Sequence, residues 1–125
     1  MKNHALNKWI LQRFSAIVLI PLLLFLLYSL VDLVNQDYTG ALDFFDSYLS
    51  IAIFILFLIF AGTHLKLGLG EIIEDYIQNE SMKGILNKII MLTSAILPLV
   101  GIVSLIIIIL CALIQLLIMN MTLSL

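Results

Sequence analysis

Residues 63–76 read THLKLGLGEIIEDY, and this stretch decides how the rest of the chain is interpreted. It ends a long apolar segment that begins at about Tyr48, which places His64 inside hydrocarbon and Asp75 and Tyr76 where charges resume. On an α-helix, the eleven steps from His64 to Asp75 bring the chain back to within roughly 20° of the same direction and advance it by about 16 Å. This geometry suits a cofactor buried between helices and a second ligand bound nearer the surface.

The composition excludes a water-soluble domain. Of the 125 residues, 63% are hydrophobic and only 11% are charged, and the mean hydropathy is +1.21. Soluble chains carry about a quarter charged residues, so the lipid bilayer is the solvent that fits this composition. We therefore predict an all-α integral membrane protein with a single membrane-anchor domain, residues 1–125. The net charge of −2 gives no reason to expect a nucleic-acid partner.

Three apolar segments are predicted to cross the membrane, at about residues 14–34, 48–70 and 89–119. Each is long enough for a hydrocarbon core of about 30 Å. The third segment exceeds that need and is expected to tilt or to project beyond the bilayer. Pro21 and Pro98 fall inside the first and third segments, where a mild kink is tolerated.

The basic residues predict the orientation. The loop at residues 35–47 is rich in aspartate and has no Lys or Arg, whereas the leader and the polar connection at 71–88 carry positive charge. All six basic residues lie in these two regions or at the helix ends beside them: Lys2, Lys8, Arg13, Lys66, Lys83 and Lys88. The positive-inside rule then places the N-terminus and the 71–88 connection in the cytoplasm or matrix, and the C-terminus outside.

His64 is the most informative residue of the second segment. Placing an ionisable group within a membrane costs free energy, and such a group usually faces a bundle interior, a cavity or a partner. His64 is interpreted either as a metal ligand or as a structural group bonded to a neighbouring helix. One histidine supplies one axial position, so a six-coordinate haem would need its second ligand from another chain. Gly62 and Gly68 either leave room for a flat macrocycle or serve close helix packing.

Three further side chains near the inner surface are candidates for binding. The phenol of Tyr76 can donate a hydrogen bond to a carbonyl oxygen, and the carboxyl of Asp75 can hold water or relay protons; both types are also common at span ends. Arg13 opens the first segment, where a guanidinium can bind carboxylates such as haem propionates or simply anchor the helix. The chain contains no nucleophile elbow and no phosphate-binding glycine loop.

Two motifs carry a resemblance to a known family. Gln12–Arg13–Phe14–Ser15–Ala16 at the start of the first segment, and His64 followed by Gly68 and Asp75–Tyr76, resemble the membrane anchor of succinate dehydrogenase, respiratory complex II. The resemblance spans roughly residues 7–117. More specifically, the chain resembles the smaller of the two hydrophobic anchor subunits, the small cytochrome b subunit. Related proteins often carry a histidine a few residues before the arginine, where this chain has Asn7, Lys8 and Trp9.

This resemblance implies cofactors and partners. His64 would be an axial ligand of haem b, shared with a histidine of the second hydrophobic anchor subunit. Gly68 would pack against the haem, and Arg13 would lie near a propionate. Tyr76 would hydrogen-bond ubiquinone, with Asp75 beside it supplying protons. The flavoprotein and iron–sulfur subunits would oxidise succinate and dock on the inner face, so the chain alone is not expected to be a catalyst.

Three alternatives stay open at this point. The chain is alternatively a haem-free structural anchor of a respiratory complex, with His64 bonded to a neighbouring helix, or the anchor of a fumarate reductase. A small pore-forming protein is a rival from another class, since three apolar spans also suffice for a pore. The expected location is the bacterial plasma membrane or the mitochondrial inner membrane.

Overall fold

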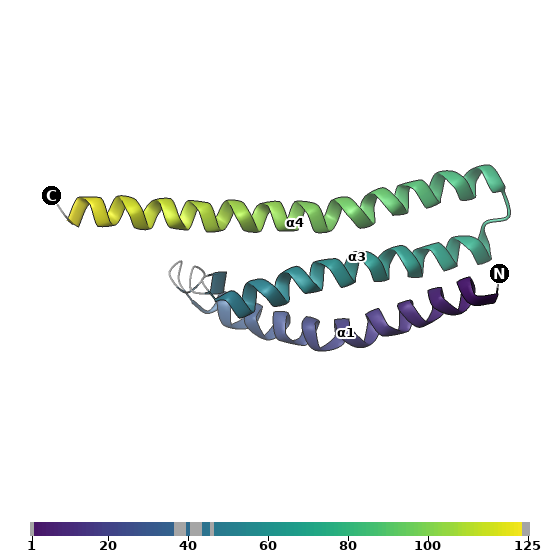
Figure 1. The fold of residues 1–125 in the computed structure, drawn as a ribbon, viewed down its shortest axis with the longest axis horizontal. Helices are drawn as coiled ribbons and strands as arrows, with labels where there is room; N and C mark the ends of the chain where they lie inside the picture. The colour runs from purple at the N-terminus through teal and green to yellow at the C-terminus, as the bar shows by residue number, and fades with distance from the viewer. Residues whose placement is uncertain (1, 37–39, 41–43, 46, 124–125) are drawn as a thin grey trace.

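The chain folds into three long α-helices. A computed structural model describes residues 2–36, 40, 44–45 and 47–123, with only the backbone of residues 2–5. In order along the chain, the helices are α1 (Lys2–Val34), α3 (Tyr48–Tyr76) and α4 (Glu80–Leu123) (Figure 1). No strand occurs in this described part, which confirms the predicted all-α class.

All three helices are long and apolar enough to cross a membrane, which confirms the predicted number of helices able to span it. At 1.5 Å per residue, the 33, 29 and 44 residues of α1, α3 and α4 correspond to about 50, 44 and 66 Å. A bilayer core is about 30 Å thick, so α4 is roughly twice as long as a span requires. Its C-terminal part extends past the ends of both other helices (Figure 1).

The polar connection between the second and third spans is mostly helical. α3 continues through residues 71–76, and α4 already begins at Glu80, so only residues 77–79 separate the two helices. Ile77 ends α3 in an extended conformation, with φ −100° and ψ 111°. Asn79 then caps the start of α4, because its Oδ1 accepts hydrogen bonds from the backbone N–H groups of Ser81 (3.0 Å) and Met82 (3.1 Å). Polar residues therefore end the apolar span without ending the helix.

The helices form one layer with α3 in the middle. α3 packs against α1 on one side and against α4 on the other, whereas α1 and α4 make no contact with each other in the described residues (Figure 1). The start of α1 lies at the same end of the molecule as the α3–α4 connection. Because the helices do not close into a bundle, both faces of the layer remain open.

Small residues bring α3 close to α4. A Cβ atom on Gly62 would lie 2.6 Å from the backbone oxygen of Ser94 and 2.7 Å from Cγ of Pro98. Pro98 has no N–H to donate to the carbonyl of Ser94, four residues earlier, and this freed carbonyl faces Gly62. Further along, a Cβ on Gly101 would lie 2.7 Å from Cδ1 of Leu58. Of the two interpretations of Gly62, close helix packing is therefore the one its surroundings support.

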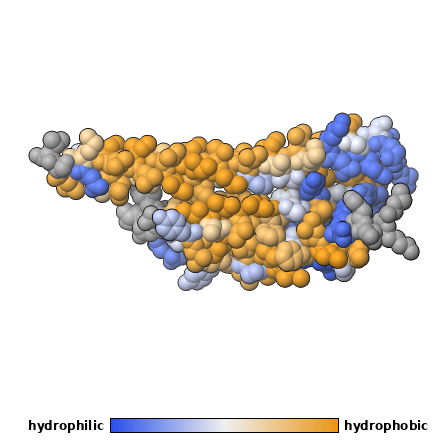
Figure 2. Space-filling model, in the orientation of Figure 1, coloured by the Kyte–Doolittle hydropathy of each residue, from blue (hydrophilic) through white to orange (hydrophobic). Residues whose placement is uncertain are grey.

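The surface is that of a protein immersed in lipid. Only Ile73, Ile90 and Leu105 are buried large hydrophobic residues in the described part of the chain. Figure 2 shows hydrophobic surface along most of the molecule and polar surface gathered at the end that holds the start of α1 and the α3–α4 connection. The aspartates predicted to fill the first loop, at positions 37, 43 and 46, lie outside the described residues.

Candidate functional site between helices α1 and α3

His64 faces α1 and contacts a buried hydroxyl there. Its Nδ1 atom lies 3.0 Å from Oγ of Ser15, forty-nine residues earlier in the chain. Ser15 is 0% exposed, and its Oγ also lies 2.8 Å from the backbone oxygen of Gln12. A single contact between two helices thus holds the imidazole from one side.

The other ring nitrogen of His64 is not engaged. Nε2 makes no hydrogen bond within the described residues. In this part of the chain, no fully buried side-chain nitrogen or oxygen lacks a hydrogen-bond partner, so Nε2 is not fully buried. His64 itself is only partly buried. One turn before it, Phe60 packs against Phe14 of α1, with ring centroids 6.1 Å apart and planes tilted by 59°. The ring is therefore held at Nδ1 and reachable from outside the chain at Nε2.

Gly68 lies one helical turn after His64 and also faces α1. A Cβ atom at Gly68 would meet only Nε2 of Gln12, at the ordinary contact distance of 3.7 Å. Gly68 therefore has no tight packing role inside this chain, in contrast to Gly62. Its bare backbone beside His64 leaves a surface on which a flat ring can lie.

Asp75 and Tyr76 lie at the end of α3. The helix is unbroken from His64 to Asp75, so the advance of about 16 Å applies. Asp75 is exposed, and Tyr76, the last residue of α3, is 79% exposed. Neither side chain has a hydrogen-bond or ionic partner among the described residues. Both groups are thus free to meet a ligand or a partner at the polar end of the molecule.

Arg13 stacks on an aromatic neighbour of its own helix. Its guanidinium carbon lies 5.2 Å from the ring centroid of Trp9, one turn earlier. Arg13 is exposed and forms no ion pair within the described residues. A guanidinium stacked on a ring still presents its N–H edge, so Arg13 keeps the capacity to bind a carboxylate.

The structure brings some of the predicted residues together and leaves others apart. His64 and Gly68 share one face of α3, while Asp75 and Tyr76 lie at its end and Arg13 lies on the neighbouring helix. The serine of the first motif, which contacts His64, was not predicted to be a site residue. The signal that could have identified it is a hydroxyl side chain near the start of the first apolar segment, residues 14–34.

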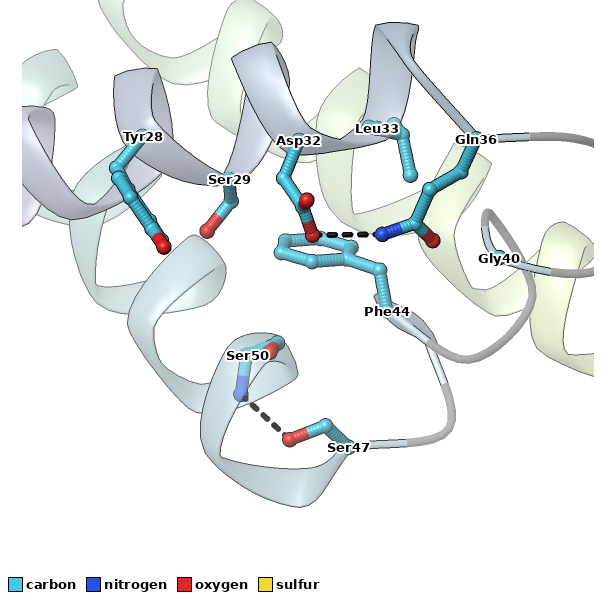
Figure 3. Close-up of a pocket in the computed structure, with 9 residues that line it drawn as sticks. All are labelled: Tyr28, Ser29, Asp32, Leu33, Gln36, Gly40, Phe44, Ser47 and Ser50. Carbon is cyan, nitrogen blue, oxygen red and sulfur yellow. Dashed lines mark hydrogen bonds between the residues drawn. The ribbon is translucent and has the colours of Figure 1, made fainter.

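A cavity of about 310 Å³ lies at the opposite end of the α1–α3 pair (Figure 3). Its wall includes the carboxyl of Asp32, which accepts a hydrogen bond of 2.7 Å from Gln36, and the N-capping Ser47 of α3. The lining residues are Tyr28, Ser29, Asp32, Leu33, Gln36, Gly40, Phe44, Ser47 and Ser50. Ser50 is fourteen residues before His64, about 21 Å along α3, so this cavity is separate from the histidine site.

The fold and the site define a membrane protein with three spanning helices and a single histidine presented between two of them. The described residues hold no cluster of three or more His, Cys, Asp or Glu side chains that could bind a metal ion by itself. Residues 1–103 match the family of the succinate dehydrogenase/fumarate reductase transmembrane subunit. Because this match extends over most of the chain, the protein belongs to that family. No curated protein and no solved structure matches the chain significantly.

Membership in this family has two direct consequences. The protein is a membrane-anchor subunit, and it works as one part of a complex with partner subunits. The apolar surface and the open single-layer arrangement of α1, α3 and α4 agree with a chain that is completed by other components.

Proposed function

We propose that the protein is the anchor of a succinate dehydrogenase that contributes one axial ligand to haem b and part of a ubiquinone site. The observation that carries this proposal is the asymmetric environment of His64, with Nδ1 3.0 Å from Ser15 and Nε2 without a partner in the described residues. A purely structural histidine has no need of an accessible second nitrogen. A ligand requires one.

The residues around His64 fit a haem. Gly68 leaves bare backbone one turn away, and the open face of the helix layer gives the ring access from outside the chain. Arg13 would bind a propionate, since its guanidinium edge is exposed. When bound, haem b supplies a one-electron acceptor at this position. The second ligand would come from the partner anchor subunit, because one histidine supplies one ligand and His64 is the one histidine whose side chain the structure describes.

Tyr76 and Asp75 are proposed to serve ubiquinone. The exposed phenol of Tyr76 would donate a hydrogen bond to a quinone carbonyl and so hold it at the end of α3. The exposed carboxyl of Asp75, next to it in sequence, would pass protons from the aqueous side to the reduced oxygen. Both roles require that this end of the molecule face water, which its polar surface supports (Figure 2).

The proposed orientation places this polar end in the cytoplasm or matrix. The start of α1 and the α3–α4 connection lie at this end together (Figure 1). Residues 2–13 and 71–88 carry five of the six basic residues of the chain: Lys2, Lys8, Arg13, Lys83 and Lys88. The flavoprotein and iron–sulfur subunits would dock there, and electrons from succinate would reach the quinone beside Tyr76. The membrane would be the bacterial plasma membrane or the mitochondrial inner membrane.

A haem-free structural anchor is the second candidate, and the Ser15–His64 contact favours it. A histidine bonded to a neighbouring helix stabilises the α1–α3 pair without any cofactor. This candidate predicts a purified complex with all its subunits and no haem absorbance. A fumarate reductase anchor differs from the first candidate in the direction of the reaction, which the ratio of succinate oxidation to fumarate reduction in the purified complex measures.

The deciding experiment is the reduced-minus-oxidised spectrum of the assembled complex with His64→Ala. We expect the b-type haem absorbance to disappear or to shift strongly. Thr63→Val is the matched control, because Thr63 is adjacent and bonds only to the backbone of its own helix (2.9 Å to the oxygen of Ile59). A His64→Ala complex with the wild-type haem spectrum contradicts the assignment of this ligand.

A further inference from the structure

Ser15 is the one fully buried side chain in the described part of the chain, and its hydroxyl lies against the candidate metal ligand. We propose that Ser15 is a positioning residue that fixes the tautomer of His64, with the proton on Nδ1 and the lone pair of Nε2 directed to iron. This inference rests on the proposed function, in which His64 binds haem. It assigns to Ser15 a task that acts through His64.

The hydroxyl of Ser15 makes more contacts than it has protons to donate. The hydroxyl of Ser15 has one proton to donate and two lone pairs that accept. It makes two contacts, one of 2.8 Å to the backbone oxygen of Gln12 and one of 3.0 Å to Nδ1 of His64. A carbonyl oxygen only accepts, so the contact with Gln12 is a hydrogen bond only when Ser15 donates to it.

The second contact then requires a proton from the imidazole. With the hydroxyl proton directed to Gln12, the remaining contact is a hydrogen bond only if Nδ1–H of His64 donates to Oγ of Ser15. In the opposite tautomer, the hydroxyl proton would point to Nδ1, and two oxygens would face each other at 2.8 Å with no proton between them. Because Ser15 is 0% exposed, no water replaces the lost bond, and an unpaired polar group in a buried position is destabilising.

The neutral ring is the form that concerns metal binding. A ring with protons on both nitrogens has no lone pair to offer a metal, whereas a neutral ring has one on the nitrogen that carries no proton. The ion pairs in the described residues are Lys8–Glu74 and Lys83–Glu80, and neither includes His64. The neutral ring with Nδ1–H therefore satisfies both contacts of the serine hydroxyl and leaves Nε2 with its lone pair.

Positioning of this kind affects a bound metal. A hydrogen bond at the ring nitrogen that does not bind the metal fixes the orientation of a ligating histidine and raises its basicity, and loss of such a partner typically weakens metal binding by about 10–100-fold. A less basic ligand stabilises the oxidised iron less, which raises the reduction potential. Ser15→Ala is therefore expected to speed haem loss and to move the potential upward, without removing the ligand itself.

The first test observes the tautomer directly and needs no haem. The full chain, with ¹⁵N-labelled histidine, is reconstituted in lipid bilayers, and the nitrogen shifts are recorded by solid-state NMR. His4→Gln leaves His64 as the one labelled histidine and assigns its signals. We expect a protonated Nδ1 and an unprotonated Nε2. A protonated Nε2 with an unprotonated Nδ1 overturns the inference, whether or not any variant assembles.

The second test uses the assembled complex and two serine variants. Ser15→Ala is expected to transfer haem to an excess of a haem-scavenging apoprotein about 10–100-fold faster and to show a higher reduction potential. Ser15→Thr keeps a hydroxyl on Cβ and is expected to restore both values. Ser94→Ala is the matched control, since Ser94 is 8% exposed and bonds to the carbonyl three residues earlier (3.0 Å), as Ser15 does, but contacts no histidine.

The outcomes separate this inference from the proposed function. Loss of haem in His64→Ala together with wild-type values in Ser15→Ala overturns the role of Ser15 and leaves His64 as the ligand. Haem retained in His64→Ala overturns the proposed function itself. A threonine variant that behaves like the alanine variant, or a Ser94→Ala variant with the same changes as Ser15→Ala, also counts against a specific role of the Ser15 hydroxyl.

Discussion

Lys8 and Glu74 form an ion pair, with 3.2 Å between Nζ and Oε1, that joins the beginning of α1 to the last turn of α3. Seven residues further along α1, Ser15 meets His64, so the two contacts fix the register of the antiparallel pair at two depths. The exposed Tyr76 follows Glu74 by two residues. The ion pair therefore holds the proposed quinone end of α3 beside the leader.

The Lys8–Glu74 pair is expected to add little to stability. Its side chains are 23% and 58% exposed, and exposed pairs contribute about 0.2–1 kcal/mol. A double-mutant cycle of Lys8→Met and Glu74→Gln should give a coupling energy in that range, measured by unfolding of the purified chain in mixed micelles. Glu71→Gln, one turn earlier on α3, should show no coupling to Lys8→Met. A coupling well above about 1 kcal/mol contradicts this prediction.

Gly62 and Gly68 should respond oppositely to the same substitution. Gly62→Ala places a methyl group 2.6 Å from the carbonyl oxygen of Ser94, which is backbone and cannot move aside, so we expect a loss of about 1–3 kcal/mol. Gly68→Ala meets only an ordinary contact, and alanine favours a helix by up to about 1 kcal/mol over glycine. Free energies of unfolding of the two variants test this, and equal losses at both sites would refute it.

Gly68 also allows the haem proposal to be examined without unfolding the protein. A larger residue, as in Gly68→Leu, should reduce the haem content of the assembled complex while the complex still forms, because the substitution fills the bare surface beside His64. Haem per flavin is the measurement. Wild-type haem content in this variant would show that no ring lies against Gly68.

Tyr76→Phe should impair quinone reduction selectively. Loss of one hydrogen bond of about 0.5–1.5 kcal/mol corresponds to a roughly 2- to 13-fold lower rate. Succinate oxidation with an artificial dye as acceptor should stay unchanged, because the dye does not use this site. Tyr28→Phe is the control, since Tyr28 is similarly exposed (76%, against 79% for Tyr76) but lies at the other end of the helices. Equal quinone rates in Tyr76→Phe and wild type would remove the role of the phenol.

Arg13→Gln should lower the haem reduction potential. If Arg13 lies beside the propionates as proposed, removal of its positive charge favours the more positively charged, oxidised iron, which is the opposite direction to that expected for Ser15→Ala. A redox titration of the assembled complex measures the shift. Lys83→Gln removes a charge at the same end of the molecule, from a residue paired with Glu80, and should leave the potential unchanged. An upward shift in Arg13→Gln would contradict the placement of Arg13 near the haem.

Composition and segment length were sufficient to predict the three helices. Hydrocarbon leaves no water for free backbone groups, so long apolar segments must become helices whatever their neighbours are. The lengths of the helices could not be predicted in the same way. α3 continues through Glu71 and Glu74 to Tyr76, because backbone hydrogen bonds propagate through polar residues until the chain turns at residues 77–79, where Asn79 caps the start of α4.

The sequence by itself determined that this chain is a membrane protein and which of its side chains are energetically costly to place in hydrocarbon. It also determined that His64 and Asp75 lie on one helix, about 16 Å apart along its axis. Only the tertiary structure decided that Gly62 packs against α4 while Gly68 stays bare, and that Ser15 is the partner of His64. The reason is physical: spacing along one helix follows from its fixed rise, whereas the depth at which two helices meet depends on which small side chains let their backbones approach.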